Sequence, residues 1–302
     1  MLRDIEIFRT VMTSGSASKA AALLGVSQPA VSQSLRKLEA KAGLLLFQRV
    51  RGRLQATPEA QALLVEVDRC FVGLESIAHR LTTLRNFGVG SLNLASYPAL
   101  GMGFLPRTIA KHQDAHPRTA ISLQIMSSTD VRERVLSAQC DLGLMADEAS
   151  TVGLEHSIFA KAAGVVVLRQ DHKLARKKII EPQDLAGLPF VSLNPEDAAR
   201  RRLEVKLNLA GVQLTTVVHT PYAITVCELA LRGVGVGIVF PIAALDFMER
   251  GLVMRRFALD VEFTSHVAFT PGRPLSSEVK QFLASMRKQL AEDLNRVAVL
   301  LK

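Results

Sequence analysis

The stretch GSASKAAALLGVSQPAVSQSLRKLE, residues 15–39, reads as two short helices joined by a tight turn. Ser16 or Ser18 is placed to cap the first helix, and Gly25 supplies the left-handed residue that ends it. Ser27 is placed to cap the second helix. The stretch therefore predicts a helix-turn-helix.

The two faces of the second helix differ in character. Val31, Leu35 and Leu38 recur at helical spacing and predict a side that faces a core. The other side starts with amides and hydroxyls and continues with cations, an order that suits base edges and then phosphates in a DNA major groove. An ordinary helical hairpin with a solvated polar face is the alternative. The predicted DNA contacts of this helix are Ser27, Gln28, Pro29, Ser32, Gln33, Arg36 and Lys37.

Positive charge is concentrated near the N-terminus. The chain has 302 residues and a formal charge of +9, and residues 1–58 hold nine Lys or Arg against three Asp or Glu. Such an excess in one small module indicates binding to a polyanion, because each neutralised phosphate releases counterions. A membrane surface is the alternative partner, and it is weakened because the segment lacks a wide apolar face with aromatic anchors.

The composition, with 48% hydrophobic and 22% charged residues, predicts compact structure in more than one domain. The N-terminus lacks a signal-peptide pattern, and no stretch approaches the roughly 20 apolar residues that a membrane span needs. We therefore expect a cytoplasmic protein without a membrane partner. The three cysteines, Cys70, Cys140 and Cys227, stand far apart among apolar neighbours, which favours buried thiols over disulfides or a metal site.

A short hairpin, or wing, is predicted directly after the helices. An apolar run, a turn at residues 50–52 and the segment 53–56 give its outline. Arg49, Arg51 and Arg53 alternate along it, and a period of two would gather them if strand pairing extends that far. We expect these arginines to contact phosphates beside the recognition helix. A solvated hairpin tip is the alternative.

A long helix is predicted from Pro58 to about Arg85, with Thr57 as its cap. Its apolar residues recur at alternating spacings of three and four, which is the pattern of a coiled-coil seam. We expect this seam to pair with a second copy of the chain, and burial inside one chain is the alternative. The predicted dimer contacts are Leu63, Val67, Cys70, Leu74, Ile77 and Leu81. A second stripe, expected to pack on the N-terminal module, consists of Leu64, Phe71 and Ala78.

Beyond a linker at residues 86–90, short apolar strands alternate with helices, which predicts an α/β region with two open sheets. The expected strands are 92–95, 121–125, 142–145, 164–168, 190–193, 215–218, 236–239 and 264–269. The expected helices are 103–112, 131–138, 198–209, 223–231 and 278–301.

Ligands of such sheets bind beyond the carboxyl ends of strands, often at helix N-termini. Polar residues occupy these positions in both halves of the region, although plain helix caps would use the same residue types. The candidate ligand contacts are Ser96, Tyr97, Ser127, Ser128, Thr129, Asn194 and Tyr222.

Two other patterns do not support a catalytic or metal site. Gly233-x-Gly235-x-Gly237 lies between a helix and a following strand, the reverse of the order that places pyrophosphate on a helix end. His112 and His116 have no carboxylate between them, and Pro117 ends their helix. We therefore expect no metal, no cofactor and no enzyme activity.

Four short motifs follow one another along the N-terminal region. They are Ser27-Gln28-Pro29-Ala30-Val31-Ser32, Leu38-Glu39, Leu46-Phe47-x-Arg49 and Thr57-Pro58. With these motifs the chain resembles LysR-type transcriptional regulators over nearly its whole length. The segments 137–144, 233–235 and 251–257 resemble the branch that holds the lysine-biosynthesis regulator and opine-catabolism regulators.

The resemblance implies a winged helix-turn-helix at residues 1–58, a dimerising linker helix at 59–87 and a periplasmic-binding-protein-like effector domain at 88–302. The effector domain would divide into subdomain I, about 91–161 and 267–302, and subdomain II, about 162–266. The implied partners are double-stranded DNA, a small effector such as an amino acid or opine-like anion, further copies in a homotetramer, and RNA polymerase.

Two positions depart from the family pattern. Gln33 stands where many members have Arg, and Ser96-Tyr97 replaces other pairs at the effector site. A competing hypothesis is a small-molecule-binding or catalytic α/β protein whose N-terminal module serves only assembly.

Overall fold

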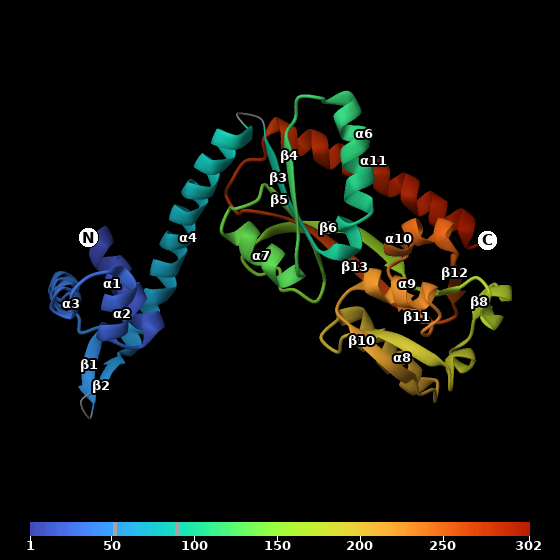
Figure 1. Cartoon of the computed structure of the whole chain (residues 1–302), viewed down its shortest axis with the longest axis horizontal. Coiled ribbons are helices and arrows are strands. Elements are labelled where there is room, and N and C mark those ends of the chain that lie inside the picture. The colour runs from blue at the N-terminus through green and yellow to red at the C-terminus, as the bar shows by residue number, and fades with distance from the viewer. Residues whose placement is uncertain (51–52, 88–90) are drawn as a thin grey trace. The chain divides into compact units, whose positions relative to one another are not determined.

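The computed structural model describes residues 1–50, 53–87 and 91–302 (Figure 1). They form two compact units, Met1–Ala78 and His79–Lys302. None of the described helices combines the length and apolar character that a membrane crossing requires.

Three helices open the first unit, as predicted: α1 (Leu2–Ser14), α2 (Ala17–Leu24) and α3 (Gln28–Ala42). The expected caps are present, because Ser16 Oγ accepts from Lys19 N at 3.1 Å and Ser27 Oγ accepts from Ala30 N at 3.4 Å. Gly25 ends α2 with a φ of 64°, a conformation that costs glycine little. The core between these helices includes Ile7, Phe8, Val11, Ala20, Ala21, Val31 and Leu35.

The wing is an antiparallel pair of β1 (Phe47–Val50) and β2 (Arg53–Ala56). Glu39 at the far end of α3 fastens it, since its carboxylate accepts from Leu46 N at 2.8 Å and from Phe47 N at 3.0 Å. A charge-assisted bond of this kind is stronger than a neutral one. The motif residue Glu39 thus holds the recognition helix and the wing in one arrangement.

The long helix α4 runs over Pro58–Phe87. Thr57 joins it to the wing: its hydroxyl accepts from Ala60 N at 3.2 Å and donates to the carbonyl of Leu45 at 2.9 Å. Farther along, Arg9 of α1 forms an ion pair with Asp68 at 2.7 Å and stacks its guanidinium over the Phe71 ring at 4.8 Å. These contacts fix the first half of α4 on the helix-turn-helix.

The second unit contains a five-stranded sheet with the order β4-β3-β5-β13-β6. Its strands are β3 (Leu92–Ser96), β4 (Ile121–Ile125), β5 (Leu142–Ala146), β6 (Glu155–Ala163) and β13 (Glu262–Phe269). The helices on it are α5 (Pro98–Gly101), α6 (Phe104–Ala115), α7 (Ser128–Leu136) and α11 (Ser277–Leu300). Figure 1 shows α7 on the opposite side of β3, β4 and β5 from α6 and α11.

Alternation along the strands explains the two layers. Leu94 and Leu144 belong to the core that also contains residues of α6 and α11, whereas their neighbours Ala95 and Met145 belong to a second core with Val131 of α7. Successive side chains of a strand point to opposite faces, so both faces of this sheet are covered.

A second sheet has the order β11-β7-β12-β8, and a parallel pair, β10-β9, continues it through a bridge between Phe190 and Val236. Its strands are β7 (Val165–Arg169), β8 (Ile179–Ile180), β9 (Pro189–Leu193), β10 (Thr215–Thr220), β11 (Gly237–Val239) and β12 (Leu252–Phe257). The helical segments are α8 (Ala198–Leu209), α9 (Ala223–Leu231), α10 (Pro241–Ala244), and the 3-10 turns η1 (Lys173–Arg176), η2 (Pro182–Leu185) and η3 (Leu245–Arg250).

The chain passes between the two sheets twice, from β6 to β7 and from β12 to β13. All eight predicted strands and all five predicted helices of this region are present. The bounds of β4, α8 and α9 are as predicted, and the ends of the others are shifted. The predictions missed β6, β8 and β12 and the short helices α5 and α10.

The glycines of Gly233-x-Gly235-x-Gly237 serve packing, as expected. A Cβ on Gly235 would lie 2.5 Å from the carbonyl oxygen of Pro189, and one on Gly237 would lie 2.3 Å from a methyl of Val226. The cysteine prediction is confirmed for Cys140 and Cys227, which are buried, and wrong for Cys70, which is exposed on α4.

Candidate DNA-binding and effector-binding sites

A groove lies beside the recognition helix α3. One wall of the groove is a side of α3 that carries Gln28, Ser32 and Arg36. The groove is also lined by Ser18 of α2 and Leu54 of the wing. The amide of Gln28 donates to Ser32 Oγ at 3.0 Å, and Arg36 Nε donates to the carbonyl of Ser32 at 3.3 Å. Both contacts are exposed and local, so a ligand in the groove would find these donors within reach.

The remaining predicted residues of α3 have different surroundings. Ser27 caps the helix, while Pro29 and Gln33 are exposed and do not line the groove. Lys37 forms an ion pair with Asp4 of α1 at 3.6 Å. Burial tends to raise the pKa of Asp4, but its hydrogen bond to the N-terminal ammonium and the charge of Lys37 outweigh this effect and lower that pKa. Lys37 is thus partly neutralised within its own module.

The wing arginines are only partly covered by the structure. Arg49 pairs with Leu54, and Val50 pairs with Arg53, so Arg49 and Arg53 do not stand opposite each other in the hairpin. Arg51 lies outside the described residues, as do the side chains of Arg49 and Arg53. Their clustering stays a prediction.

The seam of α4 divides into two parts. Val67 is buried in the core of the helix-turn-helix and Leu63 packs against the same core, so both side chains already have contacts within their own module. A partner contact at these two positions stays a prediction. Beyond Phe71 the apolar seam residues are uncovered: Leu74 is 38%, Ile77 59% and Leu81 63% exposed. Among the seam residues whose side chains the structure describes, Cys70, Leu74, Ile77 and Leu81 are exposed and available to a second copy.

A cavity lies between the two sheets of the second unit. Its lining comes from the carboxyl ends of β3, β5, β9, β10 and β11 and from β13. This is the place where open α/β sheets bind ligands. The lining residues are Tyr97, Pro98, Ala99, Ala146, Asp147, Glu148, Leu193, Asp197, Ala199, Pro221, Tyr222, Ala223, Phe240, Phe263, Thr264 and Ser265.

Two of the seven predicted effector residues, Tyr97 and Tyr222, line this cavity. The hydroxyl of Tyr97 bonds to Ser265 Oγ at 2.5 Å, and burial is the main cause that raises its pKa far above the usual value. The hydroxyl is therefore neutral and shared with Ser265.

The other five predicted residues do not line the cavity. Ser96 is fully buried and its hydroxyl donates to the carbonyl of Tyr97 at 3.0 Å, which makes it a structural residue. Ser127 caps α7, accepting from Asp130 N at 3.1 Å, and Thr129 is exposed outside the lining. Asn194 is half-buried outside it as well.

Ser128 acts on the cavity indirectly. Its hydroxyl accepts from Ala146 N at 3.1 Å, and it also tends to lower the pKa of the neighbouring Glu148. It therefore positions a residue that lines the cavity.

Sequence reasoning missed the three carboxylates of the lining, Asp147, Glu148 and Asp197. Burial raises the pKa of Glu148 and of Asp197, and the neighbouring carboxylates raise both pKa values further. Their sequence positions carried a usable signal, because Asp147 and Glu148 directly follow a predicted strand and Asp197 directly precedes a predicted helix.

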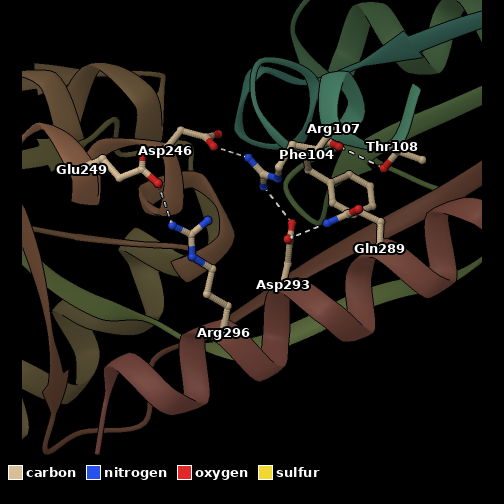
Figure 2. Close-up of polar contacts among 8 residues, drawn as sticks. All are labelled: Phe104, Arg107, Thr108, Asp246, Glu249, Gln289, Asp293 and Arg296. Carbon is tan, nitrogen blue, oxygen red and sulfur yellow. Dashed lines mark hydrogen bonds and ion pairs between the residues drawn. The ribbon is translucent and has the colours of Figure 1, made fainter. Parts of the chain in front are cut away.

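Ion pairs join the two halves of the second unit. Asp147, after β5, pairs with Arg202 of α8 at 2.7 Å. Arg107 of α6 pairs with Asp246 of η3, and Arg296 of α11 pairs with Glu249 of η3 at 3.2 Å (Figure 2). A change in the distance between the halves would therefore alter several charge contacts together.

A winged helix-turn-helix followed by a two-sheet unit with a cavity between its sheets defines a ligand-responsive transcriptional regulator. Comparisons with known proteins agree. Residues 2–61 match the family described as bacterial regulatory helix-turn-helix protein, lysR family, and residues 86–291 match the LysR substrate binding domain. The chain belongs to the LysR family of transcriptional regulators.

Relatives resemble the chain over nearly its full length. The transcriptional activator protein LysR of Escherichia coli (strain K12) is 36% identical, with 96% of this chain and 93% of that protein covered. The regulatory protein NocR of Agrobacterium fabrum is 30% identical, with 94% and 95% covered. These relatives are regulators, in agreement with the expectation that the chain is not an enzyme.

Solved structures show the same fold. The full-length regulator CbnR in complex with its target DNA has a TM-score of 0.61 and 19% identity, with 96% of this chain and 99% of that chain covered. At this identity the likeness concerns the fold alone.

Proposed function

We propose that this regulator binds promoter DNA through the groove face of α3, with Gln28 and Ser32 reading base edges and Arg36 meeting a guanine edge or a phosphate. The observation that carries the proposal is that these three side chains line one groove, on a helix that Glu39 fastens to the wing. Amides and arginine are the side chains that recognise adenine and guanine edges in the major groove. Arg49, Arg51, Arg53 and Lys37 would add backbone contacts.

The effector would bind in the cavity between the sheets. Its lining combines carboxylates and hydroxyls with apolar walls, as a site for a small polar molecule of the amino-acid or opine class would. The octopine catabolism/uptake operon regulatory protein OccR of Rhizobium meliloti, 30% identical with 86% of each chain covered, supports this class. The ligand would change the hinge between the two halves, about 91–161 with 267–302 and about 162–266, only as far as it prefers one arrangement over the other.

Assembly would use the uncovered part of the α4 seam for a dimer, with two dimers forming a homotetramer. Contact with RNA polymerase at a promoter and a cytoplasmic location complete the proposal. The apolar exposure of Leu74, Ile77 and Leu81 supports the dimer, because such residues at seam spacing are normally covered.

The test is to select DNA fragments with the full chain, sequence them and measure binding to the selected site at several salt concentrations. A regulator should show a selected motif and an affinity that falls with salt at a log–log slope of about −0.9 per phosphate neutralised. Absence of any selected motif would favour the competing hypothesis, in which the N-terminal module serves only assembly.

A further inference from the structure

The cavity between the sheets is acidic. Asp147 and Glu148 line it from the end of β5, and Asp197 lines it from the start of α8. Among the described residues that form the lining, none is a lysine, arginine or histidine. A ligand in this cavity therefore meets carboxylates and no cation.

One nearby cation is already engaged. Arg202, outside the lining, pairs with Asp147 at 2.7 Å, donates to the carbonyl of Glu262 at 2.9 Å and acts on Asp197 by its charge alone. Asp197 accepts from the backbone N–H of Arg200 at 2.8 Å. Within the described parts of the chain, no cation forms an ion pair with Glu148 or Asp197.

These two carboxylates stand on opposite halves of the unit and line the same cavity, and the charge of Asp197 raises the pKa of Glu148. In the absence of a ligand they repel across the cavity. A positive charge between them would replace this repulsion by two attractions, in surroundings where burial strengthens electrostatic interactions.

We propose that the effector carries a positively charged nitrogen group, an amine or guanidinium, that Glu148 and Asp197 bind from the two sides of the cavity. The inference rests on the proposed function, in which this cavity holds the effector. Apolar walls from Tyr97, Tyr222 and Phe240 accommodate the hydrocarbon part of such a molecule. A net anion is disfavoured, so an amino acid with a basic side chain fits the lining better than an opine whose charge is negative.

The cation also ties the halves together. Because Glu148 belongs to the first half and Asp197 to the second, binding favours the arrangement in which both reach the same nitrogen. The affinity for the cation and the closing of the cavity are therefore coupled.

The experiment compares matched ligands by titration calorimetry on the full chain. Lysine is paired with norleucine, which lacks the terminal amine, and arginine is paired with citrulline, which is its neutral counterpart; glutamate is the anionic probe. At least one basic amino acid should bind about tenfold or more tightly than its neutral partner, a difference of about 1.4 kcal/mol.

Two variants locate the binding groups. Glu148→Gln keeps the shape of the side chain, and Asp197→Asn keeps a residue that caps α8 well. Each should weaken the basic ligand about tenfold, or about 1.4 kcal/mol, and leave the neutral partner unchanged. Glu196→Gln, an exposed neighbour outside the lining, is the control and should bind like the parent.

Three outcomes would overturn the inference: equal binding of the neutral and basic partners, stronger binding of glutamate, or no binding of either basic amino acid at millimolar concentration. Retained affinity in both cavity variants would also overturn it. Binding to the selected DNA site is measured beside each titration. If the ligand prediction fails but the protein still binds its specific DNA site, the inference about the effector is overturned and the proposed DNA-binding function is not.

Discussion

The guanidinium of Arg107 on α6 lies 2.7 Å from the carboxylate of Asp293 on α11 (Figure 2). Gln289 donates to the other oxygen of Asp293 at 2.8 Å, and Arg107 also pairs with Asp246 of η3. The side chain of Asp293 is only 5% exposed. One arginine therefore neutralises a buried carboxylate in the first half of the unit and reaches the second half.

Arg107→Met should strongly destabilise the effector-binding unit. The substitution leaves Asp293 buried with an amide and no ion-pair partner, and breaking a buried pair in this way costs about 3 kcal/mol or more. Lys111→Met is the matched control, because Lys111 joins the same two helices through an exposed pair with Glu292 and should contribute less than about 1 kcal/mol. Denaturant unfolding of both variants checks the difference, and equal losses would contradict it.

Glu148→Gln should stabilise the ligand-free protein at about pH 7. Burial raises the pKa of Glu148 above its ordinary value of 4.5, so the folded state binds the proton more tightly than the unfolded state does. Ionisation of Glu148 therefore lowers the free energy of unfolding. The full loss applies at pH values above the pKa of the folded state, and it disappears at pH values below the pKa of the unfolded state.

The measurement is the melting temperature of the parent and the variant across this range. The advantage of Glu148→Gln should be present at about pH 7 and vanish by about pH 4. The melting temperature of Glu196→Gln should differ little from that of the parent at either pH, because Glu196 is exposed and lies outside the cavity lining. An advantage that persists at the acid end would show that the gain does not come from ionisation of Glu148.

Local signals explain why the N-terminal helices were predictable. The caps Ser16 and Ser27 and the left-handed Gly25 act within one turn of their own position, so their effect can be seen in the sequence. The strands β6 and β12 carry no such signal. Most of the first half of β6 is exposed at a sheet edge, and β12 interrupts its apolar pattern with Arg255 and Arg256.

The position of the cavity could be predicted from the sequence, but most of the residues that line it could not. Polar residues after strands pointed to the correct edge of the sheets, yet Ser96 is fully buried beside its own backbone while Asp147 and Glu148 line the space. Which side chain at a strand end reaches the cavity depends on packing between distant segments, such as the contact of Tyr97 with Ser265. Spacing along the chain does not contain this information.

The seam of α4 shows the same limit. Val67 and Leu74 occupy equivalent positions in the repeat, but Val67 meets the core of the helix-turn-helix and Leu74 does not. A repeat identifies an apolar face and leaves open which part of it the chain covers with its own residues.

Arg36→Ala should weaken binding to the selected DNA site by about 1–3 kcal/mol, because a bidentate arginine contact to guanine discriminates by that amount. Lys41→Ala is the control, since it removes one cation from the last turn of the same helix, outside the groove. Gln28→Ala should instead change which sequences are selected. A gel-shift titration compares the first two variants, and repeated selection tests the third. Parent-like affinity of a folded Arg36→Ala would place the reading face elsewhere.

Leu74→Glu should separate the dimer. The side chain lies in the uncovered part of the seam, and pairing with a second copy would bury the new carboxylate among Ile77 and Leu81, at a cost of several kcal/mol without a cation partner. The matched control is Val65→Glu, an equally drastic change at a position of α4 that is 53% exposed and off the seam. Size-exclusion chromatography with light scattering should give a smaller assembly for Leu74→Glu alone. An unchanged assembly in a folded Leu74→Glu protein would move the dimer contact away from α4, and dissociation by both substitutions would show that the seam is not its specific surface.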